Sequence, residues 1–164
     1  MERCAMKYIY LLTGGAKMSD FELVAVTDQS GLKICKAIRR RVFIDEQGVE
    51  ECLELDEHDI PGGKCRHFYA AVNGNPAGAF RVMNKGNGTA KLQRFCVLSE
   101  YRKIGLGRFM LEQLEELCRT EQYDIIEMGA QCHAVPFYEK CGYSVVSGVF
   151  MDAGIEHVKM EKTL

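Results

Sequence analysis

The chain has 164 residues, 47% of them hydrophobic and 27% charged, which is the composition of one globular domain and excludes a disordered or fibrous protein. The 21 basic and 23 acidic residues leave a net charge of −2, which argues against nucleic-acid binding through a general basic field. No apolar run approaches the roughly 20 residues of a membrane span, so we expect neither nucleic acid nor a membrane as a partner.

The first part of the chain predicts an extension, a strand and a helix. We expect residues 1–18 to form a poorly ordered N-terminal extension and residues 19–164 to form a single domain. Residues 20–27 alternate apolar and polar side chains, as a half-buried strand does. From residue 30 the apolar side chains recur at three- and four-residue steps, which is typical of one face of a helix.

An acidic segment follows the predicted helix. Residues 45–59 show no periodicity and contain eight carboxylates with no lysine or arginine. Three short runs then favour β-structure, over residues 67–72, 77–83 and 89–98. Asn-Gly between the first two runs is a strong hairpin signal. We therefore predict an antiparallel meander of three strands.

The remaining elements complete a mixed pattern. An amphipathic helix begins at Leu106, a buried strand covers residues 124–128, and a short helix covers residues 135–141. Two closing strands are expected over residues 143–151 and 156–161. This order is neither a regular βαβ alternation nor all-β, so it predicts an α+β fold with a central twisted mixed sheet, mostly antiparallel, flanked by helices.

Eight cysteines raise the question of disulfide bonds or a metal site. None forms a C-x-x-C pair, the spacing that zinc sites and redox dithiols use. Several stand where an apolar residue would, as at Cys35, Cys96 and Cys118, which is typical of buried free thiols. We therefore expect no metal and a reducing, cytoplasmic location.

Residues 102–108 join a predicted strand to a predicted helix through two glycines. Glycine lets the backbone approach a ligand closely, and the first turn of a helix offers unpaired N–H groups at the positive end of its dipole. The natural guest there is a phosphate. The dinucleotide motif G-x-G-x-x-G is incomplete, because Met110 takes the third glycine position, and the P-loop pattern is absent. An ordinary tight turn is the alternative interpretation.

This R-x-x-G-x-G segment, placed after an antiparallel meander, resembles the pyrophosphate loop of the GNAT superfamily, the acyl-CoA-dependent N-acyltransferases. Residues 94–97 resemble the end of the family's fourth strand, and residues 136–143 resemble its F-Y-x-K-x-G-F/Y segment. Residues 38–49 with 55–59 are similar to a branch of small, single-domain, bacterial-type members. The resemblance covers residues 19–164.

The resemblance implies direct transfer of an acetyl group from acetyl-CoA to an amine. Backbone N–H groups of residues 103–108 would hold the pyrophosphate, and residues 95–97 would pair with the pantetheine and polarise the thioester carbonyl. The full set of implied cofactor-binding residues is Phe95, Cys96, Val97, Arg102, Lys103, Ile104, Gly105, Leu106, Gly107, Arg108, Gln131 and Phe137.

The resemblance also places Tyr138 at the family's frequent general-acid position, where its phenol would protonate the departing CoA sulfur. Alternatively, its ring only packs beside the cofactor. The general base is open among Glu57, His58, Asp59 and His157, and histidine has the advantage of titrating near neutrality. Our catalytic assignment is Tyr138, Glu57 and His157.

We therefore expect an N-acetyltransferase that acts on a primary amine. Because the acidic segment would border the acceptor side of the cleft, a cationic small molecule or peptide is the predicted acceptor. One alternative is a non-catalytic acyl-CoA-binding sensor or interaction module, and a weaker one is a redox or metal protein that uses the cysteines. The resemblance also allows a homodimer.

Overall fold

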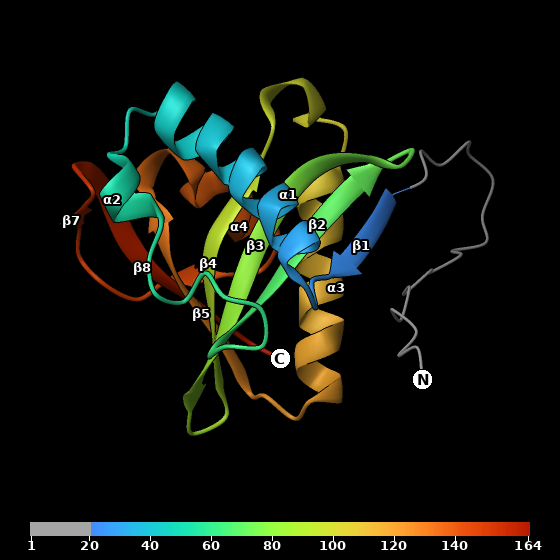
Figure 1. Cartoon of the computed structure of the whole chain (residues 1–164). Coiled ribbons are helices and arrows are strands. Elements are labelled where there is room, and N and C mark those ends of the chain that lie inside the picture. The colour runs from blue at the N-terminus through green and yellow to red at the C-terminus, as the bar shows by residue number, and fades with distance from the viewer. Residues whose placement is uncertain (1–20) are drawn as a thin grey trace.

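A twisted sheet of eight strands runs through the protein (Figure 1). The computed structural model describes residues 21–164, so the extension expected over residues 1–18 lies outside the described residues. Along the sheet the strands follow the order β1-β2-β3-β4-β5-β8-β6, and β7 also pairs with β8. Their bounds are β1 (Phe21–Ala25), β2 (Cys65–Val72), β3 (Asn75–Gly86), β4 (Thr89–Val97), β5 (Ile125–Gln131), β6 (Ser144–Val145), β7 (Phe150–Asp152) and β8 (Ile155–Thr163).

The predicted meander is confirmed, since β3 pairs antiparallel with β2 on one side and with β4 on the other. Asn73 and Gly74 join β2 to β3 with φ of 50° and 78°, as a two-residue hairpin turn requires. β5 then lies parallel to β4 and antiparallel to β8. The fold is therefore the predicted α+β class with a mixed, mostly antiparallel sheet.

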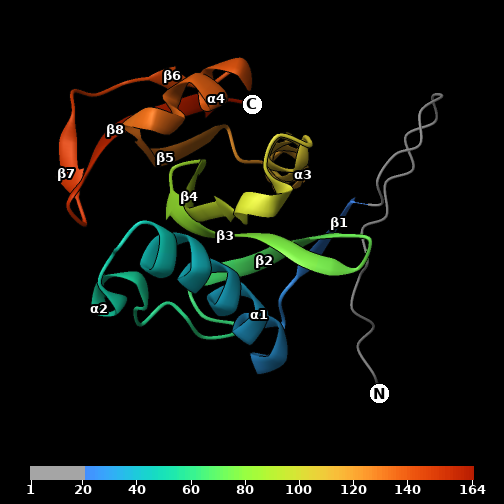
Figure 2. The same cartoon turned by 90° about the horizontal axis from the view of Figure 1, so that it is seen from above.

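Helices cover both faces of this sheet (Figure 2). One face carries α1 with its π-helical continuation and the short α2, and the other carries α3 and α4. Their bounds are α1 (Gln29–Arg39), the π-helical segment (Arg40–Glu46), α2 (Glu51–Glu54), α3 (Leu106–Thr120) and α4 (Val135–Lys140).

Two hydrophobic cores join these layers. The apolar stripe predicted on α3 is buried, and Met110 and Leu114 share the main core with Phe80 and Ile126 of the sheet. A smaller core lies beneath α1, whose buried Cys35 and Ile38 pack with side chains of β3 and β4. Burial of an apolar side chain stabilises the fold by about 1.5–3 kcal/mol. These two cores fix α1 and α3 on opposite sides of β4.

The helix predicted from residue 30 is present, but it does not end regularly. Asp28 caps α1, because its Oδ1 accepts a hydrogen bond from the Gly31 N–H at 2.8 Å. At the other end the helix widens into π-helical turns that continue to Glu46, a form that is common at functional sites. The sequence carried no signal for this change of pitch.

The strand predicted over residues 143–151 is wrong as one continuous element. It is divided into β6 and β7, with an unpaired stretch around Ser147. There the Lys159 N–H of β8 donates to Ser147 Oγ at 2.7 Å, so a side chain replaces the backbone partner. The division leaves β7 as a short strand that pairs with the start of β8 and forms a hairpin at one side of the sheet (Figure 1).

Strands β4 and β5 separate halfway along their length. They pair in parallel only from Thr89 with Ile125 to Leu92 with Met128. Directly after this point the register of β4 against β3 shifts, and Arg94 adopts φ of 55°. Such a bulge bends one strand away from its neighbour. The two strands therefore form a fork, and residues 95–97 present an edge that β5 does not pair.

Candidate active site

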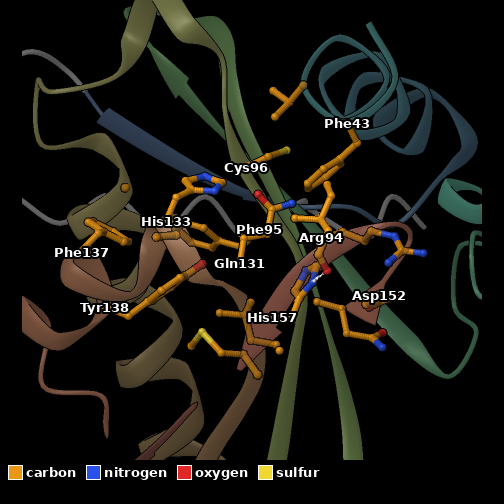
Figure 3. A pocket seen from close by; sticks show the side chains of 18 of the residues that line it. Phe43, Arg94, Phe95, Cys96, Gln131, His133, Phe137, Tyr138, Asp152 and His157 are labelled. Carbon is orange, nitrogen blue, oxygen red and sulfur yellow. Dashed lines mark hydrogen bonds between the residues drawn. The ribbon is translucent and has the colours of Figure 1, made fainter. Parts of the chain in front are cut away.

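A cavity of about 1320 Å³ lies at this fork (Figure 3). Its walls come from both arms of the fork, the π-helical segment, α2, the start of α3, α4 and the β7–β8 hairpin. Segments distant in the sequence therefore meet around one volume. A cavity of this kind, with convergent polar groups, is the first candidate for a ligand site.

The glycine loop (residues 102–108) forms one end of the cavity. Gly105 precedes α3 with φ of 93°, a left-handed conformation that glycine adopts without strain. The first backbone hydrogen bond of the helix runs from the Phe109 N–H to the Gly105 carbonyl at 3.0 Å. The N–H groups of residues 106–108 therefore have no partner within the helix, and they lie at the positive end of its dipole.

Side chains of the glycine loop play different parts. Lys103 and Arg108 line the cavity, and no ion pair holds either of them among the described residues. Ile104 is exposed and Leu106 is buried in the main core, and neither side chain lines the cavity. Ile104 and Leu106 can therefore contribute only their backbone groups to a ligand.

The guanidinium of Arg102 is engaged by protein groups. It donates to both carboxylate oxygens of Glu46, at 2.6 and 2.8 Å, and to the Val97 carbonyl at 3.0 Å. These bonds fasten the loop to the end of β4 and to the π-helical segment. In this structure Arg102 supports the loop rather than offering a free charge.

An aromatic cluster lies between the glycine loop and the fork. The rings of Phe95 and Phe137 stack with their centroids 6.3 Å apart, and Tyr138 packs edge-on against both. Phe137 also leaves little room for a side chain at position 107, since a Cβ on Gly107 would lie 3.2 Å from the Phe137 ring. The predicted residues of β4, α3 and α4 are thus brought together.

Two side chains in this region have strongly shifted acidities. Burial raises the pKa of the Cys96 thiol to about 12, so at neutral pH it is not the thiolate that a nucleophile requires. Burial also raises the pKa of Tyr138 well above its ordinary value. Its hydroxyl therefore keeps its proton, and it makes no hydrogen bond to a described residue while lining the cavity. Figure 3 shows this hydroxyl directed into the cavity.

His157 lies on β8 and also lines the cavity (Figure 3). Its Nδ1 lies 2.8 Å from the Ile155 carbonyl. A carbonyl oxygen only accepts hydrogen bonds, so Nδ1 carries the hydrogen and the neutral ring has its lone pair at Nε2. Phe150 stacks on the ring with centroids 5.9 Å apart. Both contacts fix the orientation that a general base needs.

The other base candidates lie elsewhere. The Glu57 side chain is 84% exposed and does not line the cavity, nor do His58 and Asp59. Asp59 is buried and bonded to Arg39. The structure thus brings His157 to the cavity that Tyr138 lines and leaves Glu57 outside it. The segment after α2 is instead held by Asp59 against Arg39 of α1 and Arg81 of β3.

Three arginines and three carboxylates form what we call the charge ring. Each member is paired with an oppositely charged neighbour on either side, so the ring closes on itself. In order, the members are Arg39, Glu54, Arg94, Asp56, Arg81 and Asp59. Arg94 also donates to the Leu53 and Glu54 carbonyls at 2.9 and 3.2 Å, which ties α2 to the bulge of β4.

The charge ring corrects our expectation about the acidic segment. Glu54, Asp56 and Asp59 do not present free carboxylates to a cationic acceptor, because arginines from α1, β3 and β4 neutralise them. The sequence shows eight acidic residues in a row of fifteen positions without a basic one. It does not show that the partners lie up to 40 residues away along the chain.

The sequence did not single out several residues of the cavity. Gln47 and Gln131 exchange two amide hydrogen bonds, at 3.2 and 2.8 Å, across the fork. Gln131 was an expected cofactor residue, but Gln47 was not. His133 and Lys91 also line the cavity. Isolated polar residues on a turn or a strand carry no spacing signal, so only the fold could place them here.

The described residues contain no group of three or more potential metal ligands of the His, Cys, Asp or Glu type. Within the same part of the chain, no helix is long and apolar enough to cross a membrane. The cysteines that the structure describes have free thiols.

Comparison with known proteins identifies the fold and the family of the chain. YyaT of Bacillus subtilis is 39% identical over 139 residues, which cover 85% of this chain and 93% of YyaT. The crystal structure of an acyl-CoA N-acyltransferase from Pseudomonas aeruginosa matches with a TM-score of 0.75 at 22% identity, covering 87% of this chain and 99% of that one.

An aminoglycoside 6'-N-acetyltransferase, solved in complex with coenzyme A, has the same fold, with a TM-score of 0.68 at 18% identity over 86% of this chain and 96% of that one. The acetyltransferase (GNAT) domain family matches residues 25–164, which include every wall of the cavity. The chain therefore belongs to the GNAT acetyltransferase family.

Proposed function

We propose that this protein transfers the acetyl group of acetyl-CoA directly to the nitrogen of a primary amine. The observation that carries the proposal is the shared cavity, in which the unpaired N–H groups of residues 106–108, the free edge of residues 95–97, Tyr138 and His157 meet. Each of these groups has a place in one reaction, and no other cluster of the described residues offers the same set.

The cofactor would lie along the fork. Its pyrophosphate suits the N–H groups at the start of α3, with Lys103 and Arg108 beside it. Its pantetheine would pair with residues 95–97 as a further strand does, between the arms of the fork, and Gln131 and Phe137 would flank it. The coenzyme A bound to the structurally related aminoglycoside acetyltransferase supports this choice of cofactor.

The chemistry is a nucleophilic substitution at the thioester carbonyl. The neutral amine attacks that carbon, and a backbone N–H among residues 95–97 stabilises the negative oxygen of the tetrahedral intermediate. His157 Nε2 takes the proton that the nitrogen loses, and the C–S bond breaks as Tyr138 gives its proton to the departing sulfur. An acyl-cysteine route has no support, because the Cys96 thiol is buried and protonated.

The cationic acceptor predicted from the acidic segment loses its basis, since the charge ring neutralises Glu54, Asp56 and Asp59. A catalytic role for Glu57 loses its basis as well, because that side chain lies outside the cavity. The cytoplasm as location and a homodimer remain predictions, the second to be checked by size-exclusion chromatography with light scattering.

Thiol release from acetyl-CoA with a panel of primary amines tests the proposal. Amine-dependent release, with mass spectrometry showing an increase of one acetyl group on the amine, is the expected result. The alternative, a non-catalytic acyl-CoA-binding module, predicts that acetyl-CoA raises the melting temperature while no amine releases thiol.

A further inference from the structure

The cavity continues beyond His157 and Tyr138, away from the glycine loop. This part is lined by Lys85 of β3, Lys91 of β4 and Lys159 of β8, and we call it the lysine end. Lys91 lies six residues before Val97 on β4, which is about 20 Å along an extended strand. With the cofactor placed as proposed, between the glycine loop and residues 95–97, the lysine end is therefore on the acceptor side of the reaction centre.

Two of these lysines already have carboxylate partners. Glu127 is buried between them, with its carboxylate 2.7 Å from Lys85 Nζ and 3.2 Å from Lys159 Nζ. Lys159 Nζ also lies 3.2 Å from the Glu161 carboxylate. The charges of Lys85 and Lys159 are therefore balanced by Glu127 and Glu161.

Lys91 is different. It is half-buried beside Glu127 in the sheet register and lines the cavity, yet its ammonium has no hydrogen bond or ion pair to a described residue. Arg94 also lines the cavity, but it does not compete with Lys91 for an anionic ligand, because the charge ring engages its guanidinium. One uncompensated positive charge is therefore directed at the acceptor side.

Gln93 adds a donor next to this charge. Its side-chain oxygen accepts a hydrogen bond from Arg81 Nε at 3.1 Å, so the amide NH₂ is the end that remains for the cavity that Gln93 lines. Residues two apart on a strand share one face and lie about 7 Å apart. Lys91 and Gln93 thus offer an ammonium and an amide N–H on the same wall.

We infer that the acceptor carries an anionic group, a carboxylate or a phosphate, in addition to its primary amine, and that Lys91 and Gln93 bind this group. The inference rests on the proposed function and names the substrate class of the same site. Asp152, the remaining acidic group that lines this region, is the exposed last residue of β7, where water screens its charge more strongly.

The test compares acceptors that differ only at the anionic end. A series of ω-amino acids of increasing chain length is assayed by thiol release against the matching carboxamides and the matching aminoalkyl phosphates. We expect kcat/KM for at least one anionic acceptor to exceed that of its carboxamide by about tenfold or more, as a charge-assisted hydrogen bond implies. The carboxylate and phosphate arms decide which anion is preferred.

Variants of the lysine end complete the test. Lys91→Met should remove the preference for the anionic acceptor while leaving the carboxamide's kcat/KM and the acetyl-CoA affinity unchanged, and Lys91→Arg should retain it. Lys33→Met is the matched control, because that exposed lysine lies on α1 outside the cavity. Equal rates for anionic and neutral acceptors, or an equal loss on both in Lys91→Met, would overturn the inference alone. No thiol release with any amine would overturn the proposed function and this inference with it.

Discussion

Arg102 and Glu46 are joined by two hydrogen bonds, of 2.6 and 2.8 Å, that connect the start of the glycine loop to the last residue of the π-helical segment. The bond lowers the pKa of the Glu46 carboxyl, so the pair remains ionised at neutral pH. Although its members lie 56 positions apart, this contact fixes the distance between the two sides of the cofactor end.

Arg102→Ala should weaken acetyl-CoA binding by about three- to tenfold, because the loop loses its bonds to Glu46 and to the Val97 carbonyl. Isothermal titration calorimetry measures the change. Arg41→Ala is the control, since it removes an exposed pair with Glu100 that lies outside the cavity. An equal effect of both variants would contradict the supporting role of Arg102.

Gly105→Val should abolish the thermal stabilisation by acetyl-CoA while the protein remains folded. A valine at φ of 93° is strained by roughly 1–2 kcal/mol, and relief of that strain would redirect the N–H groups of the first α3 turn. Gly62→Val is matched to it, with φ of 71° and open space around its Cβ but no place in the cavity. Retained stabilisation in Gly105→Val would count against the phosphate site.

Tyr138→Phe should lower the single-turnover rate by about 10²–10⁴-fold with little change in acetyl-CoA affinity, because it removes a proton donor and keeps the ring. Single-turnover measurement avoids a limit set by product release. Tyr143→Phe is the control, because that buried tyrosine packs on Tyr138 without lining the cavity. A loss below about threefold would favour a packing role.

The charge ring predicts a loss of stability in acid. The hydrogen bonds from Arg81 lower the pKa of Asp56, and although burial alone would raise it, the hydrogen bond from Arg39 leaves the pKa of Asp59 lowered. A lowered folded-state pKa stabilises the protein above the unfolded value of about 3.9. That contribution is lost as the pH falls from there through the folded-state pKa.

Asp59→Asn should therefore reduce the free energy of unfolding at neutral pH by about 3 kcal/mol, since it opens the ring and leaves the buried Arg39 and Arg81 with one carboxylate partner each. It should also flatten the decline between about pH 5 and pH 2. Urea denaturation at several pH values measures both effects. Asp45→Asn, at an exposed residue outside the ring, should change neither.

Local patterns in the sequence were sufficient to predict most elements of the fold. The Asn73–Gly74 turn, the alternation in β2 to β4 and the apolar stripe of α3 each depend on residues a few positions apart, so they could be read directly. The glycine loop and Tyr138 were placed by resemblance, and the structure brings them to one cavity.

Features that depend on distant residues could not be predicted in the same way. The charge ring joins residues of α1, β3 and β4 to the acidic segment, so the segment seemed to offer its charges to a ligand. The break between β6 and β7 depends on Ser147 Oγ replacing a backbone acceptor. In both cases the partner of a polar group is a side chain that local patterning does not reveal.

The fork between β4 and β5 also has a mechanical consequence. Four residues of each strand form the parallel ladder that joins β1–β4 to β5–β8 within the sheet. This ladder is shorter than the one between β3 and β4 and the one between β5 and β8. A pantetheine lying between the arms would contact both strands and so extend the connection between β4 and β5 beyond the ladder. Amide hydrogen exchange should then slow on both β4 and β5 when acetyl-CoA binds, including at positions that the cofactor does not touch.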